Sequence, residues 1–271
     1  MIQSAEDQSY LVELVDGVLR LSFNRPQSGN AIPKTTVPQL IDLFHASQAD
    51  PSVRCILVRG EGKVFSAGGD IAGFAKSIEQ DVETRQADFA RRLPLARKLV
   101  EAIAAFDRPI VTSVRGAAAG AGLFYPLVAD YAIGDETAAF VFAHQRVALS
   151  PDAGVTAVLP QVVGTRMARM LLMTAAKVEA REALRLGILH HIVPADALED
   201  EAMKVARRLA RAPQLAIKTA KKMVNDAPHQ TLAEILDAET AGIVACVGDP
   251  DFAEGVRAFL EKRPTSFPST Q

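Results

Sequence analysis

Hydrophobic and polar positions in the first part of the chain form short runs typical of strands. Two alternating runs, Tyr10–Val15 and Val18–Phe23, flank the pair Asp16-Gly17 and predict a β-hairpin. Two further runs, Cys55–Val58 within a strand at 53–58 and Ile110–Val114, indicate strands that are buried on both faces. Strands of this kind belong to parallel sheets, whose faces are covered by helices.

Helical periodicity fills most of the remaining chain. It first appears between the strands, at Thr36–Ala49 and 82–106, where Pro94 predicts that a helix starts or is kinked. After Gly164 the pattern becomes almost entirely helical, and helices are predicted at 166–173, 180–186, 198–211, 216–224, 232–247 and 252–262. We therefore predict an α/β core at 1–200 with mostly parallel strands, and a helical region at 201–271 that must pack on the core or on another subunit.

Two of the predicted strands lead into loops of small residues. The strand at 53–58 is followed by KVFSAGGD at 63–70, and Ile110–Val114 is followed by RGAAAGAG at 115–122. If the loops face one another, each offers a backbone N–H to the same carbonyl oxygen, as in an oxyanion hole. The alternative is an ordinary glycine-rich turn in which Asp70 caps the next helix. Neither loop has the spacing of a dinucleotide-binding or phosphate-binding loop.

These two loops resemble those of the crotonase superfamily, the enoyl-CoA hydratase/isomerase group. Further segments are similar to the family in the same order along nearly the whole chain: FNRP at 23–26 with Asn30-Ala31, SPDAG at 150–154, LPQVVG at 159–164, ALRLGIL at 183–189 and EGVRAFLEKR at 254–263. The resemblance implies a crotonase-like core of repeated strand-strand-helix units and a helical C-terminal trimerisation region. It also implies an acyl-CoA thioester substrate and an enolate intermediate held by two amides.

The resemblance assigns these roles to particular residues. It places one oxyanion donor at the amide of Ala67, with Gly69 as the adjoining candidate, and the other at Ala121, with Gly120 beside it. It places substrate binding at Arg25, Ser66, Ala67, Gly68, Gly69, Asp70, Gly120, Phe124, Phe259 and Lys262, the last two on this subunit or a neighbouring one.

The acid/base residues depart from the hydratase pattern. Hydratases of this group use two glutamates, and alignment on the loops and on SPDAG places Phe124 and His144 at those positions. A phenyl ring cannot hold or deprotonate water. Asp152 remains as the acid/base candidate, because it resembles the aspartate with which several isomerases of the superfamily move a proton. In this interpretation His144 has a supporting role beside Asp152. The alternatives are that Asp152 caps the helix after Pro151 and that His144 is a packed or surface residue.

Three functions therefore stay open. An enoyl-CoA isomerase that uses Asp152, buried against aromatic rings, is favoured; the others are a hydratase or related lyase with an altered acid/base set, and a CoA-thioester-binding protein with little catalysis. An apolar or aromatic acyl group is suggested by residues that core packing explains equally well: Phe74, Phe89, Leu93, Phe124, Tyr125 and Phe142.

Composition adds limits to this interpretation. The 271 residues are 49% hydrophobic, enough for one large core, and a net charge of −2 argues against nucleic acid as a partner. Cys55 and Cys246 have neither metal nor redox spacing, so we predict no metal and no cofactor beyond the coenzyme A of the substrate. The polar, acidic start has no signal-peptide pattern, and the longest uncharged apolar run, 116–129, is too short to span a membrane. We predict a cytoplasmic trimer or dimer of trimers, without a membrane partner.

Overall fold

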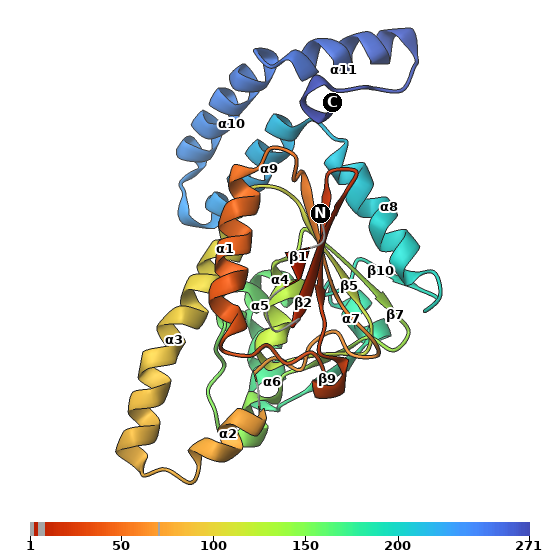
Figure 1. The fold of residues 1–271 in the computed structure, drawn as a ribbon. Helices are drawn as coiled ribbons and strands as arrows, with labels where there is room; N and C mark the ends of the chain where they lie inside the picture. The colour runs from red at the N-terminus through yellow and green to blue at the C-terminus, as the bar shows by residue number, and fades with distance from the viewer. Residues whose placement is uncertain (1–2, 5–8, 70) are drawn as a thin grey trace.

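A mostly parallel sheet runs through the centre of the protein, as seen in a computed structural model that describes residues 3–4, 9–69 and 71–271 (Figure 1). Among these residues the sheet has seven strands in the order β1-β2-β3-β4-β5-β7-β10. Their bounds are β1 Gln3–Ser4, β2 Tyr10–Val15, β3 Val18–Phe23, β4 Cys55–Gly60, β5 Ile110–Val114, β7 Tyr131–Asp135 and β10 His191–Val193. The strands β1, β2 and β3 pair antiparallel and the others parallel, which confirms the predicted hairpin and the two buried strands.

A second, small sheet lies beside the first and was not predicted. It consists of β6 (Ala117–Ala119), β8 (Ala139–Val141) and β9 (Lys177–Glu179) in the order β6-β8-β9. Each strand has only three residues. Periodicity needs a longer run to distinguish a strand from a loop, so no local pattern predicts this sheet. Its first strand is part of the second small-residue loop.

Helices cover both faces of the large sheet. The core helices are α1 (Thr36–Ala49), α2 (Ile71–Ser77), α3 (Val82–Ala104), α4 (Phe124–Val128), α5 (Val155–Val163), α6 (Thr165–Met173), α7 (Ala180–Arg185) and α8 (Leu198–Ala210). In Figure 1, α1 and α3 lie on one side of the sheet and α8 lies on the other. Helix α3 continues through Pro94, so of the two expectations, a helix start or a kink, the start is wrong. Pro94 is exposed, and water can bind the carbonyl oxygen that loses its helical partner.

Alternate side chains of the central strands enter two separate hydrophobic clusters. Ile56 and Val58 of β4 pack with α1 and α3, whereas Cys55 and Leu57 pack with α8. All four side chains are essentially inaccessible to solvent. Burial also raises the pKa of the Cys55 thiol, which therefore stays protonated and unreactive.

The last three helices lie beyond this core. Helices α9 (Gln214–Asp226), α10 (Leu232–Val247) and α11 (Pro250–Glu261) extend from one end of the sheet (Figure 1). The expected boundary at 200 falls inside α8, which packs on the sheet through Leu198 and its small residues. The helices that leave the core therefore begin at α9, later than the sequence suggested.

Short 3-10 helices fill several connections. They are η1 (Pro26–Ser28), η2 (Gly120–Leu123), η3 (Ala143–Val147), η4 (Ala227–His229) and η5 (Pro268–Thr270). Among the residues in view, no helix combines the length and apolar character needed to span a membrane.

Candidate functional site

The two small-residue loops leave neighbouring strands, β4 and β5, and run side by side. The amide of Ser66 donates to the carbonyl of Ala117 at 3.1 Å, and the amide of Ala119 donates back to the carbonyl of Ser66 at 2.8 Å. These bonds make a short parallel bridge between the first loop and β6. The relative position of the two loops is therefore set by backbone hydrogen bonds and not by flexible side chains.

Gly68 is the point of closest approach between the loops. A methyl group at this position would collide with the carbonyl oxygen of Ala119 and would lie 2.8 Å from the amide nitrogen of Ala121. The backbone of Gly68 also has a φ of +81°, which side chains other than glycine adopt with strain. Both the space and the conformation require glycine here.

Of the two amides considered in the first loop, that of Gly69 is available and that of Ala67 is not. The amide of Ala67 donates to the carbonyl of Gly29 at 2.8 Å, so the expectation that Ala67 is an oxyanion donor is wrong. Within the described chain, the amide of Gly69 has no hydrogen-bond partner in the protein. It was the adjoining candidate, and it takes the place of Ala67.

The second loop ends at the start of η2, where Ala121 lies in the first turn. The first amides of a helical turn have no partner within the turn. No partner for the Ala121 amide is found in the described residues, and the contact through Gly68 places this amide beside the first loop. Gly120, with a φ of +52°, makes the bend that precedes it. Gly69 and Ala121 are thus two available donors on adjoining loops.

The early loop that contains Asn30 holds the first small-residue loop in place through hydrogen bonds. The side-chain amide of Asn30 donates to the carbonyls of Glu61 and Val64, at 2.9 and 2.6 Å. The carbonyl of Asn30 accepts from the hydroxyl of Ser66, which in turn accepts from the amide of Gly68 at 3.1 Å. Ser66 is completely buried and committed to these bonds, so it positions the loop and does not reach a substrate.

Arg25 begins the same early loop. Its guanidinium donates to the carbonyl of Ala31 at 3.2 Å and its amide to the side chain of Asn30 at 2.8 Å. The side chain is partly exposed, so the remaining N–H groups are open to an anion. Asp70, also predicted to bind substrate, lies outside the described residues.

The structure brings together the two predicted acid/base residues. The Nε2 atom of His144, in η3, lies 3.2 Å from Oδ1 of Asp152. His144 is only 8% exposed, whereas 48% of the Asp152 side chain is exposed, so the burial expected for this carboxyl group is not seen. The helix that follows has Gly154 as its N-cap with no side-chain cap, which removes the capping role considered for Asp152.

Phe124 connects this acid/base pair to the second loop. It follows η2 directly, is 2% exposed, and lies against the turn that carries Asp152: a methyl group on Gly154 would be 3.0 Å from Cε2 of Phe124. Its neighbour Tyr125 is buried, which raises the pKa of its hydroxyl group and keeps it neutral. Phe124 thus provides an apolar surface between the donors and Asp152.

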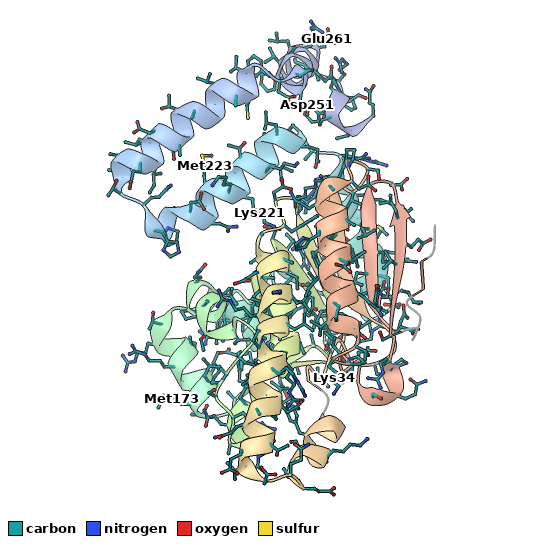
Figure 2. All side chains as sticks on the ribbon, turned by 60° about the vertical axis from the view of Figure 1, so that its left-hand side comes forward. Lys34, Met173, Lys221, Met223, Asp251 and Glu261 are labelled. Atoms are coloured by element: carbon teal, nitrogen blue, oxygen red, sulfur yellow. The ribbon has the colours of Figure 1, made fainter. Side chains whose placement is uncertain are left out.

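Phe259 and Lys262 are not part of this assembly within one chain. Both lie at the C-terminal end of α11, where Phe259 is 83% exposed. Figures 1 and 2 place α11 at the opposite end of the molecule from α2, which follows the first loop. Any contact of these two residues with a substrate at the loops must therefore come from another subunit.

Sequence reasoning missed the residues that select the donors. The carbonyl of Gly29 occupies the Ala67 amide, and Asn30 fixes the strand end that leads to it. The only local signal was the similarity of Asn30-Ala31 to the family, which says nothing about hydrogen-bond partners. Asn30 has a φ of +55°, a conformation in which asparagine is enriched.

The chain matches one family of known proteins over almost its whole length. Residues 13–270 match the model of the family described as enoyl-CoA hydratase/isomerase. The chain is 31% identical to crotonyl-CoA hydratase of Syntrophomonas wolfei, over 96% of this chain and 98% of the relative. It is 32% identical to 1,2-epoxyphenylacetyl-CoA isomerase of Escherichia coli, over 93% and 95%. A crystal structure of a putative enoyl-CoA hydratase from Streptomyces coelicolor superposes with a TM-score of 0.90 at 30% identity, over 98% and 96% of the two chains.

Proposed function

The chain belongs to the enoyl-CoA hydratase/isomerase family, and we propose that it is an isomerase that moves the double bond of an unsaturated acyl-CoA. The observation that carries this proposal is the pairing of Asp152 with His144 beside the buried Phe124. Among the described residues, Asp152 is then the one carboxylate in this assembly, and a single base is enough to move a proton between two carbons.

The loops supply the electrostatic part of the reaction. Removal of a proton beside the thioester carbonyl places negative charge on the carbonyl oxygen, where the amides of Gly69 and Ala121 donate to it. One preorganised donor of this kind is worth about 3–4 kcal/mol of barrier. Because the donors are main-chain groups on adjoining loops, they need no rearrangement when the charge develops.

Asp152 moves the proton. Starting from a 3-enoyl-CoA, its carboxylate takes a proton from carbon 2, and the electrons of that bond move into a dienolate that ends on the carbonyl oxygen. The resulting carboxylic acid returns the proton to carbon 4, and the double bond then lies between carbons 2 and 3. The number of protons and electrons is unchanged, so the reaction needs no cofactor beyond the coenzyme A of the substrate.

His144 holds Asp152 in position for both transfers. An Nε2–H group 3.2 Å from Oδ1 donates to that oxygen and leaves Oδ2 for the substrate. Phe124 excludes water on the side where a hydratase needs a glutamate to hold it. This difference favours isomerisation over hydration.

The rest of the substrate site is proposed to involve a second subunit. Arg25 and the first loop hold part of the coenzyme A, and Phe259 with Lys262 of a neighbouring chain completes the site. This arrangement requires the predicted trimer or dimer of trimers. Light scattering at micromolar protein concentration tests it, and a monomer would contradict it.

The reaction itself is tested with Asp152→Asn. The amide keeps the shape of the side chain but cannot accept the proton, so conversion of 3-enoyl-CoA to 2-enoyl-CoA should fall by about 10²- to 10⁴-fold. His144→Gln, which keeps a donor, should lose much less. The thermal transition of each variant controls for folding.

Hydration is followed in the same assay. Efficient water addition to 2-enoyl-CoA by the wild type would favour the hydratase alternative. Turnover of neither substrate over a broad series of chain lengths would favour a CoA-thioester-binding protein. Full isomerase activity in Asp152→Asn would assign the proton transfer to another residue.

A further inference from the structure

A cationic side chain packs on two aromatic rings, one of which lies next to the first small-residue loop. Phe74 of α2 and Phe89 of α3 pack with ring centroids 5.5 Å apart, and the guanidinium of Arg92 lies over them. Its central carbon is 3.6 Å from the Phe89 ring centroid and 5.4 Å from that of Phe74. Two of the aromatic residues that suggested an apolar or aromatic acyl group therefore have a positive charge stacked on them.

Arg92 is poorly satisfied by the protein. About three quarters of its side chain is buried, and its Nη2 atom is inaccessible with no hydrogen-bond partner in the described chain. The nearest carboxylate, Asp88, is 3.7 Å away, too far for a hydrogen bond. Asp88 instead accepts from Arg91 at 2.7 Å, and this bond lowers the pKa of Asp88. Arg92 thus has a long ion pair and two aromatic contacts but no hydrogen-bond acceptor for Nη2 among the described residues, and a largely buried guanidinium is costly in that state unless a ligand supplies the acceptor.

The position of Arg92 relative to the site follows from two contacts. Phe74 adjoins the first loop, because a methyl group on Gly69 would lie 3.7 Å from its Cζ atom. Further along α3, Val100 touches the Asp152 turn at Gly154. Arg92 and Val100 are eight residues apart on the inward face of α3, about 12 Å along the helix axis. The same helix face thus runs from the acid/base turn to the guanidinium.

We propose that Arg92 binds a carboxylate at the far end of the acyl group, so that the preferred substrates are unsaturated acyl-CoAs with a second, terminal carboxylate. The planar guanidinium offers parallel N–H donors that match the two oxygens of a carboxylate. Lys34, labelled in Figure 2, lies just before α1. Its positive charge helps to lower the pKa of Asp88, so it adds to the positive charge near Arg92. The inference names the substrate class of the site proposed above and rests on that site.

Binding of saturated thioesters tests this inference without any turnover. Alkanoyl-CoA and the carboxyalkanoyl-CoA of equal length are titrated against the wild type over a series of chain lengths, by calorimetry. We expect the carboxylate-ended ligand to bind about 10- to 100-fold more tightly at the best length, the effect of a charge-assisted hydrogen-bonded pair. Equal affinities at every length would overturn the proposal.

Arg92→Met removes the charge and keeps most of the volume. It should abolish the preference by weakening only the carboxylate-ended ligand, and Arg92→Lys should keep part of it. Arg97→Met is the matched control, because Arg97 lies on the outer face of α3, is 79% exposed and pairs with Glu101. A preference that survives Arg92→Met, or one that Arg97→Met removes equally, would contradict the assignment. Thermal transitions show whether each variant is folded.

Turnover separates this inference from the proposed function. If the wild type prefers the carboxylate-ended ligand in binding but isomerises neither 3-enoyl-CoA, the reaction is wrong and the role of Arg92 stands. If it isomerises both with equal kcat/KM and binds both equally, the reaction stands and the role of Arg92 is wrong.

Discussion

The core buries its apolar side chains, whereas the last three helices expose many of theirs to solvent. In β4, Ile56 and Leu57 are at most 1% exposed, whereas in α10 and α11 Ile243 is 69% and Phe259 is 83% exposed. The loops that carry the proposed oxyanion donors are fixed by hydrogen bonds within one chain. The C-terminal helices instead present an apolar surface that is open in the single chain, and we expect a second copy to cover it. In this proposal one chain builds the chemical centre, and the assembly of several chains completes the substrate site.

The largest effect is expected from Gly68→Ala, which adds one methyl group where the two loops of the core meet. It collides with the carbonyl of Ala119 and pushes the Gly69 and Ala121 amides apart, so kcat should fall by at least about 100-fold. Steady-state kinetics measures the loss. Gly164→Ala is the matched control: its φ of +79° imposes similar strain, but no atom lies within 4 Å of the added methyl group. Equal activity in the two variants would show that loop spacing does not matter.

The C-terminal surface is broken by charge on α10. Ile243→Glu combined with Val244→Glu places two carboxylates on side chains that are 69% and 68% exposed in the single chain. If the α10 surfaces of neighbouring copies pack together, each buried apolar side chain contributes about 1.5–3 kcal/mol to association. The double variant should therefore run as a monomer in light scattering. Met173→Glu is the control, since Met173 is 75% exposed at the end of core helix α6. Dissociation by both changes, or by neither, would contradict the comparison.

A smaller effect is expected where the two regions meet. Lys221 of α9 is only 11% exposed and donates to Asp130 at 2.8 Å and to the carbonyl of Arg108 at 2.9 Å (Figure 2). Lys221→Met should lower the free energy of unfolding by about 1–3 kcal/mol, because both acceptors lose a charged donor. Lys222→Met, at a position 75% exposed, should change it by less than about 0.5 kcal/mol. Denaturant titration measures both, and equal values would show that Lys221 is no anchor.

The smallest effect concerns pH at the C-terminal tail. The guanidinium of Arg263 and the amide of Ser266 donate to Glu254 and lower its pKa to about 2. A lowered pKa in the folded state adds stability above the unfolded value of about 4.5, and this is lost as the pH falls toward about 2. Amide exchange at 263–271 should therefore increase over this acidic range, and Glu254→Gln should be insensitive to it. If amide exchange at 263–271 in the wild type did not change over this pH range, Glu254 would not stabilise the tail.

Elements with strong local signals were predicted closely. Helix α10 has the predicted bounds because Thr231 and Glu234 form a capping box at its start. The strand Ile110–Val114 was correct to the residue because its side chains are buried on both faces. The two loops were recognised because small residues follow buried strands.

What the sequence could not predict depends on distant partners. The choice of Gly69 over Ala67 is made by the carbonyl of Gly29, and nothing local marks that hydrogen bond. The end of the core was misplaced because the small residues of α8 do not reveal that they face a sheet. Arg92 was overlooked because a charged residue in an exposed-looking helix is usually solvated, and only its stacking on Phe89 reveals its burial.

The order of strands in the large sheet also bears on how the protein forms. From β1 to β5 each strand pairs with the strand that precedes it along the chain, and β7 and β10 then extend the same edge. The sheet can therefore grow in one direction while the chain is still being synthesised, with each new segment docking on a finished edge. The two amides come together once β5 and β6 are in place, well before the final helices emerge. Newly made chains should acquire the two small-residue loops first and the proposed association surface last, an order that would keep half-made chains from associating prematurely.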